Sequence, residues 1–259
     1  LIGLVGSEMC IRDSGAGIGY TTLRVRGTDG TRINITANGI PMNDAESHTL
    51  FWVNMPDFAS SVKDIQVQRG AGTSTNGAGA FGASVNMQTE GISMQPYAEI
   101  NASYGSFNAH KETVKFGTGL LKDHWAFDAR LSNIGTDGYI DRASVDLNSY
   151  YLQGGYFAEN TSVKLIAFAG KEKTYHAWGY ATKEEMEKFG RRYNPCGEMY
   201  TDADGNKHYY TDQTDNYLQK NYQLLLNHSF STAWNLNVAL HYTNCLLYTS
   251  DAADDLIGV

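Results

Sequence analysis

The fold is decided by Tyr217-Leu-Gln-Lys-Asn-Tyr-Gln-Leu-Leu-Leu-Asn-His-Ser-Phe230 and, after Ser231-Thr232, by Ala233-Trp-Asn-Leu-Asn-Val-Ala-Leu-His-Tyr-Thr243. Both segments alternate apolar and polar residues, which is typical of a β-strand whose two faces meet different surroundings. Each is about twice as long as a strand of an ordinary globular protein. A tilted strand needs about this length to cross a bilayer.

Five earlier segments, near residues 97–107, 110–120, 124–135, 147–158 and 161–171, continue the same pattern. The connections at 106–108, 121–123, 159–160 and 231–232 are short, whereas those at 135–146 and 171–216 are long, so every second connection is tight. Transmembrane β-barrels alternate short and long connections in this way. Residues 97–243 are therefore predicted to form seven antiparallel transmembrane β-barrel strands, which is too few to close a barrel around a core and leaves an open curved sheet.

Residues 15–90 contain only short alternating segments, broken by glycine, and are predicted to form a small α+β unit. Short strands are expected near 23–26, 32–36, 65–69 and 84–88, and Asn38-Gly39 is a strong hairpin signal. Residues 56–62 are expected to form a short helix. The run from Gly77 to Gly82 matches a dinucleotide-binding pattern, but a strand-like segment follows it where that site needs a helix.

Charge and motifs exclude several functions. A net charge of −8 argues against binding nucleic acid. Three scattered cysteines give no disulfide framework or zinc site, and the seven histidines form no metal-binding pattern. No nucleophile elbow or recognisable carboxylate pair is present. We therefore expect no enzyme activity, no metal site and no cofactor.

The two ends of the chain are related to one another as DNA. The codons ATG TGT ATA AGA GAC for Met9-Cys-Ile-Arg-Asp13, followed by AG, have a reverse complement that reads TGT CTC TTA TAC ACA in a shifted frame. Those codons encode Cys245-Leu-Leu-Tyr-Thr249. Natural protein ends have no reason to be antisense to each other, and the shared DNA resembles a transposon end used in sequencing adaptors. Residues 1–14 and 244–259 are therefore expected to be translated adaptor.

Four segments carry a resemblance to a known family: Leu23-Arg-Val-Arg26-Gly27, Asn38-Gly39-Ile-Pro41, Ile65-Gln-Val-Gln-Arg69-Gly70 and Gly77-Ala-Gly79-Ala-Phe-Gly82-Ala-Ser-Val85. Their order and spacing resemble the plug domain of TonB-dependent outer-membrane receptors. Residues 193–198 and 213–217 resemble receptors of the Bacteroidetes type. The TonB box, a first plug strand and most barrel strands of that family are missing from the sequence.

The resemblance implies a plug (15–90) inside a barrel of roughly 22 strands, of which 97–243 would be the first part. It also implies a place in the bacterial outer membrane, contact with its lipid, and TonB as a partner whose contact region lies outside this sequence. The receptor would bind and import a scarce ligand, for which siderophore, haem, cobalamin and glycan all stay open. The alternative is a soluble β-sandwich that binds carbohydrate or serves adhesion.

Candidate ligand contacts come from two loops. The loop at 44–54 is expected to face the outside, and its exposed aromatics either contact ligand or pack on the barrel wall. The long connection at 171–216, with a short helix at Lys183–Phe189, is expected to be extracellular. The candidates are Glu46, His48, Phe51 and Trp52 in the first loop and Tyr175, His176, Trp178 and Tyr180 in the second.

The resemblance further implies a set of plug-motif residues. Arg26 and Arg69 match plug arginines of the family, with either a structural or a signalling role. The glycines allow tight packing of plug backbone. The full set is Arg26, Gly27, Arg69, Gly70, Gly77, Gly79 and Gly82.

Sequencing the locus by a method that uses no transposon adaptor should return other codons for residues 1–14 and 244–259. Genomic DNA that encodes Met9-Cys-Ile-Arg-Asp13 and Cys245-Leu-Leu-Tyr-Thr249 as printed would show that both ends are native.

Overall fold

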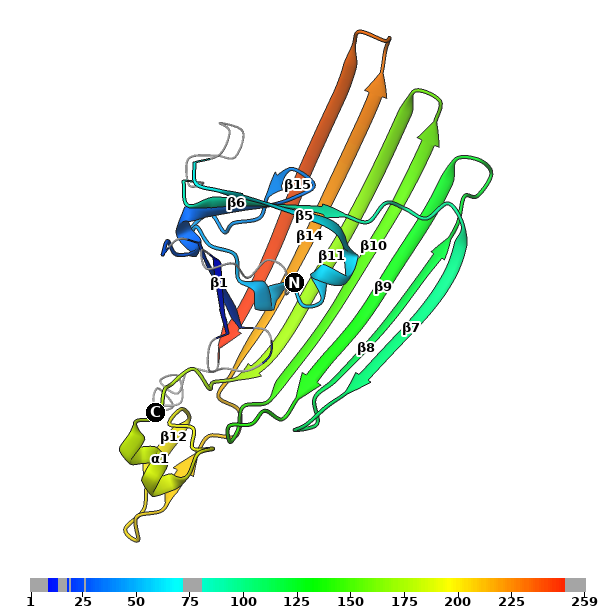
Figure 1. Ribbon diagram of the computed structural model, residues 1–259. Coiled ribbons are helices and arrows are strands. Elements are labelled where there is room, and N and C mark those ends of the chain that lie inside the picture. The colour runs from blue at the N-terminus through cyan, green and yellow to red at the C-terminus, as the bar shows by residue number, and fades with distance from the viewer. Residues whose placement is uncertain (1–8, 14–17, 19, 26, 72–80, 250–259) are drawn as a thin grey trace, which may run out of the picture.

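The computed structural model describes residues 9–13, 18, 20–25, 27–71 and 81–249. Seven long antiparallel strands form one curved, open sheet, here called the wall (Figure 1). Its spatial order is β15-β14-β11-β10-β9-β8-β7. The strands are β7 (Pro96–Tyr104), β8 (His110–Thr118), β9 (Trp125–Thr136), β10 (Val145–Ala158), β11 (Thr161–Tyr175), β14 (Thr214–Ser229) and β15 (Asn235–Thr249).

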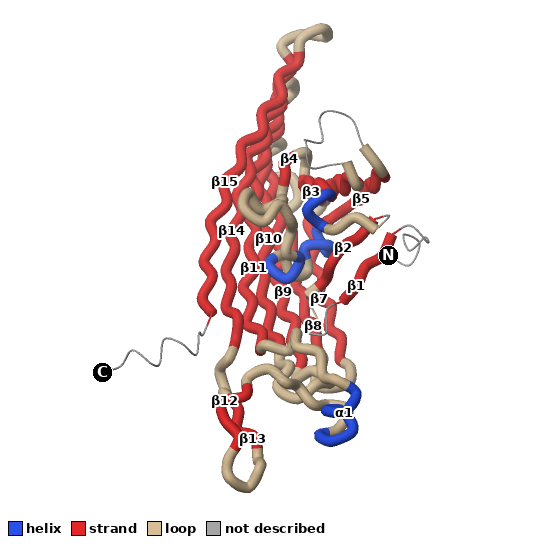
Figure 2. The backbone as a smooth tube through the Cα atoms, turned by 90° about the vertical axis from the view of Figure 1, so that its left-hand side faces the viewer, coloured by secondary structure: helices blue, strands red, loops and turns tan. Residues whose placement is uncertain are grey.

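The elements that precede the wall, β1 to β6, are here called the N-terminal unit, which lies against one face of the wall (Figures 1 and 2). Its four-stranded sheet has the order β4-β3-β6-β5, in which β3 and β6 are parallel, and β1 pairs with β2. The strands are β1 (Met9–Asp13), β2 (Thr21–Val25), β3 (Ile33–Ala37), β4 (Ile40–Pro41), β5 (Val62–Arg69) and β6 (Ala83–Thr89). In the described part of this unit, three short 3₁₀ helices span Gly30–Arg32, Trp52–Asn54 and Phe58–Ser61.

The sequence located most of these elements. All seven wall strands are present, and the hairpin turns at Asn38-Gly39, where both residues have positive φ angles of 56° and 79°. Helix α1 spans Lys183–Phe189, as expected, and Thr182 closes a capping box with Glu185 at its start. The helix expected at 56–62 is a 3₁₀ helix at Phe58–Ser61, so the described N-terminal unit is a mixed sheet without an α-helix.

Two boundaries differ from the sequence prediction. Strand β11 continues to Tyr175 and β14 begins at Thr214, so the long connection is 176–213 and not 171–216. It also contains an unforeseen hairpin of β12 (Glu198–Thr201) and β13 (Lys207–Tyr209). Strands β1 and β15 include residues 9–13 and 244–249, whose origin in adaptor DNA stays a prediction. Within the described residues, no helix has the length and apolar character needed to cross a membrane.

The register of the wall sorts its side chains into two faces. The inner face, which contacts the N-terminal unit, carries buried polar groups such as Arg130, Gln153 and Gln223. The outer face carries exposed large apolar groups. These include Val114, Phe116, Phe127, Leu131, Leu152, Leu165, Tyr222 and Leu240. This is the division expected from the alternating sequence, and a face so apolar would be costly against water.

The hydrophobic core lies between the N-terminal unit and the wall. The ring of Phe58 packs against Phe168 in β11, with 4.9 Å between ring centroids, and against Tyr151 in β10, with 6.4 Å between centroids. Close approach requires a glycine in the wall, because a Cβ at Gly170 would lie 2.3 Å from the carbonyl oxygen of Asn54 and 2.4 Å from Pro56 Cδ. The two units are thus in direct backbone contact.

A buried ion pair fixes the N-terminal unit on the wall. Asp57 has a left-handed φ of 55°. Its carboxylate forms ion pairs with Arg130, whose Nη1 is 2.7 Å from Oδ2, and with Lys111. Thr113 and Ser132 donate further hydrogen bonds to the same carboxylate. Burial alone would raise the pKa of Asp57, but the hydrogen bonds from Lys111, Ser132 and Ser60 and the charge of Arg130 lower it to about 2.

Replacing Asp57 with Asn should destabilise the seating of the N-terminal unit by about 3–5 kcal/mol, because Arg130 stays buried without a counter-charge. Hydrogen exchange of the β5 and β6 amides in the folded receptor measures the loss. Asp64→Asn, at an exposed carboxylate of β5, is the matched control and should stay within about 0.5 kcal/mol of wild type. Equal exchange in the two variants would contradict the assigned role of the pair.

The same pair sets a pH dependence. The pKa of Asp57 is lowered to about 2 in the folded state, against about 3.9 in an unfolded chain. Its stabilisation is therefore complete above that unfolded value and is lost as the pH falls through about 2.

Candidate functional site

The two candidate loops meet beside one end of the wall. Residues 176–213 extend beyond the ends of β11 and β14 (Figure 2). The first candidate loop, 44–54, belongs to the N-terminal unit: residues 42–51 connect β4 to the second 3₁₀ helix, which ends the loop. Asn43 shapes this connection, because its side-chain amide donates to the carbonyl oxygens of Ile33 and His48 and its oxygen accepts from the Ile35 amide.

A cavity of about 380 Å³, here called the aromatic cavity, lies where these loops meet. Phe51 and Trp52 contribute from the first loop and Trp178 contributes from the second. Leu23 and Ile35 of the N-terminal unit also line it. No described lining residue carries a formal charge. The cavity therefore suits a molecule, or part of one, that presents apolar or aromatic surface.

Trp178 is held in place by its neighbours. The His176 ring lies against Trp178 with 4.0 Å between centroids, and His176 Nε2 is 3.1 Å from Asp215 Oδ1. The other carboxylate oxygen of Asp215 accepts a hydrogen bond from the Tyr20 hydroxyl at 3.0 Å. A continuous set of contacts thus joins the edge of the aromatic cavity to the segment that enters β2.

Tyr20 is the point where this set of contacts reaches the N-terminal unit. Its hydroxyl also lies 3.1 Å from Glu172 Oε1 and 2.9 Å from Thr174 Oγ1, both on β11. Burial raises the pKa of Tyr20, and the nearby carboxylates of Glu172 and Asp215 raise it further. The tyrosine consequently remains a neutral hydrogen-bond donor at physiological pH.

The long connection has its own internal support. Asn194 is buried, and its side-chain amide donates to the carbonyl oxygens of Asp141 and His176. Arg142 donates to the carbonyl oxygens of Asn194 and Cys196 and stacks on Tyr209 at 3.5 Å from the ring centroid. These contacts give the loop a defined shape at the mouth of the wall.

A second cavity of about 380 Å³ adjoins the first across Phe51. It is more polar. Asn43 and Asp44 contribute from the N-terminal unit, and Tyr217, Asn221 and His241 contribute from β14 and β15. Thr49, Leu50 and Phe51 line both cavities, and Phe51 is 48% exposed.

The structure separates the eight candidate ligand residues into groups. Phe51, Trp52 and Trp178 share the aromatic cavity. Tyr180 is 70% exposed, and Glu46 and His48 are exposed on the first loop outside the lining of both cavities. Tyr175 is buried and donates to the carbonyl oxygen of Tyr210, and the ring of His176 packs against the ring of Trp178.

The described plug-motif candidates lie at turns, close backbone approaches and a strand end. Gly27 and Gly70 both have φ angles of 79°, and a Cβ at Gly82 would lie 2.8 Å from the Arg32 carbonyl oxygen. Arg69 ends β5. Arg26, Gly77 and Gly79 lie outside the described residues.

Sequence reasoning missed Tyr20, Asp57 and Asp215, which join the two units. Each is a single polar residue whose partner lies far away along the chain: 152 residues separate Tyr20 from Glu172. No local spacing signals such a contact. Among the described residues, no group of three or more His, Cys, Asp and Glu side chains could hold a metal ion.

Comparison with known proteins identifies the N-terminal unit. Residues 4–84 match the model of the TonB-dependent receptor plug domain. The match begins within the segment that the coding argument assigns to adaptor DNA, and that assignment stays a prediction. A comparison with curated protein sequences gives no match.

Solved structures share the fold of both units. The ferric citrate transporter FecA has a TM-score of 0.73 at 15% identity, over 95% of this chain and 37% of its own. The ferric yersiniabactin receptor FyuA of Yersinia pestis has 0.72 at 12%, over 96% and 38%. The ferripyoverdine receptor of the outer membrane of Pseudomonas aeruginosa has 0.68 at 15%, over 91% and 30%.

The chain thus spans about a third of the length of these receptors. The wall corresponds to part of their barrels, and the single open sheet excludes the two packed sheets of a sandwich. Residues 4–84 thus match the plug domain of TonB-dependent receptors, and the seven wall strands have the fold of part of the barrel that encloses such a plug.

Proposed function

We propose that this chain is part of a receptor of the bacterial outer membrane that binds a scarce ligand at its outer surface and imports it with energy from TonB. The observation that carries the proposal is the wall itself, an open sheet with an apolar outer face and an inner face that carries polar groups and packs against the plug. The apolar face meets lipid, and the polar face surrounds the plug.

The direction of the strands gives the orientation. Strand β7 follows directly from the plug, which in the family occupies the periplasmic side, so β7 runs outward. The tight turns between β8 and β9, β10 and β11, and β14 and β15 then lie in the periplasm. Residues 137–144 and 176–213 lie outside the cell, where a ligand arrives first.

The aromatic cavity favours a ligand with apolar or aromatic surface. The similar structures are described as a ferripyoverdine receptor, a ferric yersiniabactin uptake receptor, a ferric citrate transporter and a copper transporter. Siderophore, haem and cobalamin present such surface, and glycans present it on their sugar-ring faces. An uncharged cavity suits a compact polyanion such as citrate less well.

Trp52→Ala and Trp178→Ala should each weaken ligand binding by about tenfold or more, because both remove aromatic wall from one cavity. The measurement is uptake and equilibrium binding of a panel of iron-loaded siderophores, haem, cobalamin and oligosaccharides by cells that carry the full receptor. Trp234→Ala removes a tryptophan that is 74% exposed beside a tight turn and serves as the matched control. Unchanged binding in both cavity variants would remove the cavity from the ligand site.

Topology is tested separately with trypsin added to intact cells. Cleavage should occur after Arg191 or Arg192, which are exposed in the long connection. Cleavage after Lys122, in the tight turn before β9, should require permeabilised cells. The opposite pattern would reverse the orientation and with it the placement of the ligand site.

A further inference from the structure

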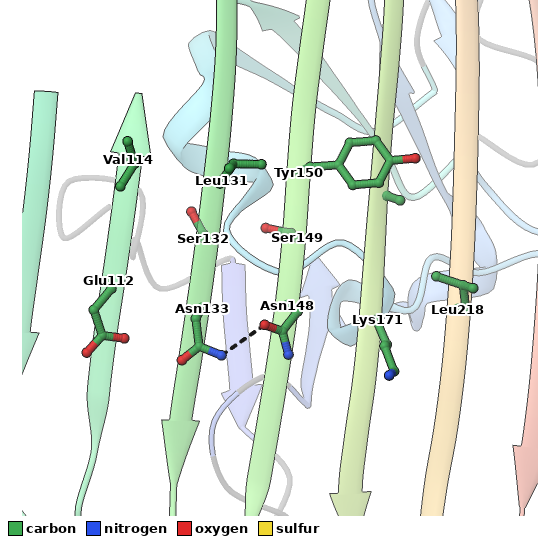
Figure 3. A pocket seen from close by; sticks show the side chains of 11 residues that line it. Glu112, Val114, Leu131, Ser132, Asn133, Asn148, Ser149, Tyr150, Lys171 and Leu218 are labelled. Carbon is green, nitrogen blue, oxygen red and sulfur yellow. Dashed lines mark hydrogen bonds between the residues drawn. The ribbon is translucent and has the colours of Figure 1, made fainter. Parts of the chain in front are cut away.

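The outer face of the wall changes from apolar to polar along β11. Figure 3 shows this change: Leu131 and Tyr150 share one row across the strands, and Asn148 and Lys171 share the next row away from the tight turns. Glu172 follows Lys171 and points to the inner face, where it contacts the N-terminal unit. Glu172 therefore lies beyond the apolar band, outside the membrane-spanning part of the wall.

Four side-chain oxygens from Tyr20 and the wall form one cluster. The Tyr20 hydroxyl lies 2.9 Å from Thr174 Oγ1, 3.0 Å from Asp215 Oδ2 and 3.1 Å from Glu172 Oε1. Thr174 Oγ1 and Glu172 Oε1 are 3.4 Å apart. The three shortest contacts need three protons, but Tyr20 and Thr174 supply only one each. With both carboxylates ionised, one of these contacts would join two oxygens with no proton between them.

Glu172 is buried without a compensating charge. It is 2% exposed, and its Oε2 has no hydrogen-bond partner among the described residues. On the neighbouring strands it lies opposite Leu147 of β10 and Tyr217 of β14. No lysine or arginine of the described segments forms an ion pair with it, and the charge of Asp215 has the same sign. In such a position the neutral acid costs less free energy than the ionised carboxylate.

The other groups around Glu172 that can gain or lose a proton come from three elements. Tyr20 belongs to the N-terminal unit, Asp215 and Tyr217 belong to β14, and His176 follows the end of β11. His176 reaches the cluster through Asp215, with 3.1 Å between Nε2 and Oδ1. Burial raises the pKa of Glu172, the hydrogen bond from Tyr20 lowers it and the charge of Asp215 raises it again, which leaves it at about 7.

We infer that Glu172 holds a proton while Tyr20 is seated on the wall, and that loss of this proton to water loosens the start of β2. In the protonated state Glu172 and Thr174 donate to the Tyr20 oxygen. Tyr20 donates to Asp215, so each of the three shortest contacts holds one proton. In the ionised state two like charges share one tyrosine hydroxyl. The contact of plug and wall is given by the structure, and only its exposure to the medium outside the cell rests on the proposed function.

The direction of the pH dependence follows from two pKa values. The pKa of Glu172 is about 7 in the folded state, against about 4.3 in an unfolded chain. The contact is therefore at full strength below about pH 4.3, weakens as the pH rises, and is lost as the pH passes about 7. Asp57, whose pKa is about 2, does not change its charge in this range.

The test uses the full receptor in phosphatidylcholine vesicles, from about pH 4 to about pH 9. Infrared difference spectra between wild type and E172Q report whether Glu172 carries a proton. Hydrogen exchange of the β2 amides reports how firmly the start of β2 is held, after correction for the intrinsic effect of pH and comparison with the β5 amides. Flotation with the vesicles confirms that each variant is inserted.

We expect the wild type to show the carbonyl band of a protonated acid below about pH 7 and to lose it above. Protection of its β2 amides should fall by up to about tenfold per pH unit between about pH 4.3 and about pH 7. E172Q carries a neutral amide that also donates to Tyr20, so its β2 amides should stay protected throughout. Y20F removes the shared hydroxyl, so its β2 amides should be weakly protected at every pH.

Two further variants separate Glu172 from its surroundings. Glu184→Gln removes an exposed carboxylate from α1 and is the matched control, which should behave as wild type does. His176→Gln removes the other basic group of the cluster and should keep the fall in protection. A missing acid band, or a fall that persists in E172Q, would overturn the inference. A fall that is lost only in H176Q would assign the proton to the histidine and would overturn it as well.

These outcomes are distinguishable from failure of the proposed function. A receptor that floats with the vesicles but shows no pH dependence of the β2 amides loses the proton site and keeps its place in the membrane. A receptor that fails to float contradicts the membrane location. The same spectra and exchange measurements in detergent then decide the proton site, because the cluster lies within one chain.

Discussion

Each wall strand has one exposed, apolar face and one face that packs against the plug, and the rest of the structure depends on keeping these two faces apart. Successive side chains of a strand point to opposite faces, so a shift of one residue would bring Arg130 and Gln153 to the outer face and Leu131 and Leu152 to the inner face. The uninterrupted register from Val145 to Ala158 against β11 shows how strictly the alignment is kept. A shift in strand pairing would therefore disrupt both the apolar outer face and the contacts of the inner face with the plug.

The contact between plug and wall combines a small apolar core with buried polar groups. Phe58, Tyr151 and Phe168 exclude water, while Asp57 and Arg130 are almost fully buried beside them. A buried ion pair adds little net stability, since desolvation offsets its attraction, but it penalises every misplacement in which either charge stays unpaired. The pair therefore sets where the plug sits. Gly170 allows that position by admitting the backbone of Asn54.

The sequence was informative where a pattern repeats and uninformative where single residues meet across the fold. Alternation located seven strands, and the capping residues located α1 at Lys183–Phe189. The predicted strand ends were less accurate. The last residues of β11 include Glu172 and Thr174, polar residues that contact Tyr20, and they interrupt the apolar alternation by which strands were recognised. Tyr20 itself carries no local signal.

The candidate ligand residues show the same limit in another form. The aromatic residues of the two loops were selected alike, but the fold brings Phe51, Trp52 and Trp178 to one cavity and uses the hydroxyl of Tyr175 within its own loop. Loop aromatics serve recognition and loop packing alike. Only the fold around each ring distinguishes the two uses.

A continuous set of side-chain contacts joins the rim of the aromatic cavity to the plug. Trp178 borders the cavity and stacks on His176, which contacts Asp215, which in turn accepts from Tyr20 just before β2. Coupling between sites requires an element with two arrangements that both sites favour unequally. Tyr20 has one hydroxyl proton and two carboxylates within reach, Glu172 and Asp215, so it can donate to only one of them at a time. Asp215 contacts His176 through one oxygen and Tyr20 through the other, so the position of His176 and the hydrogen bond at the entrance to the plug depend on the same carboxylate.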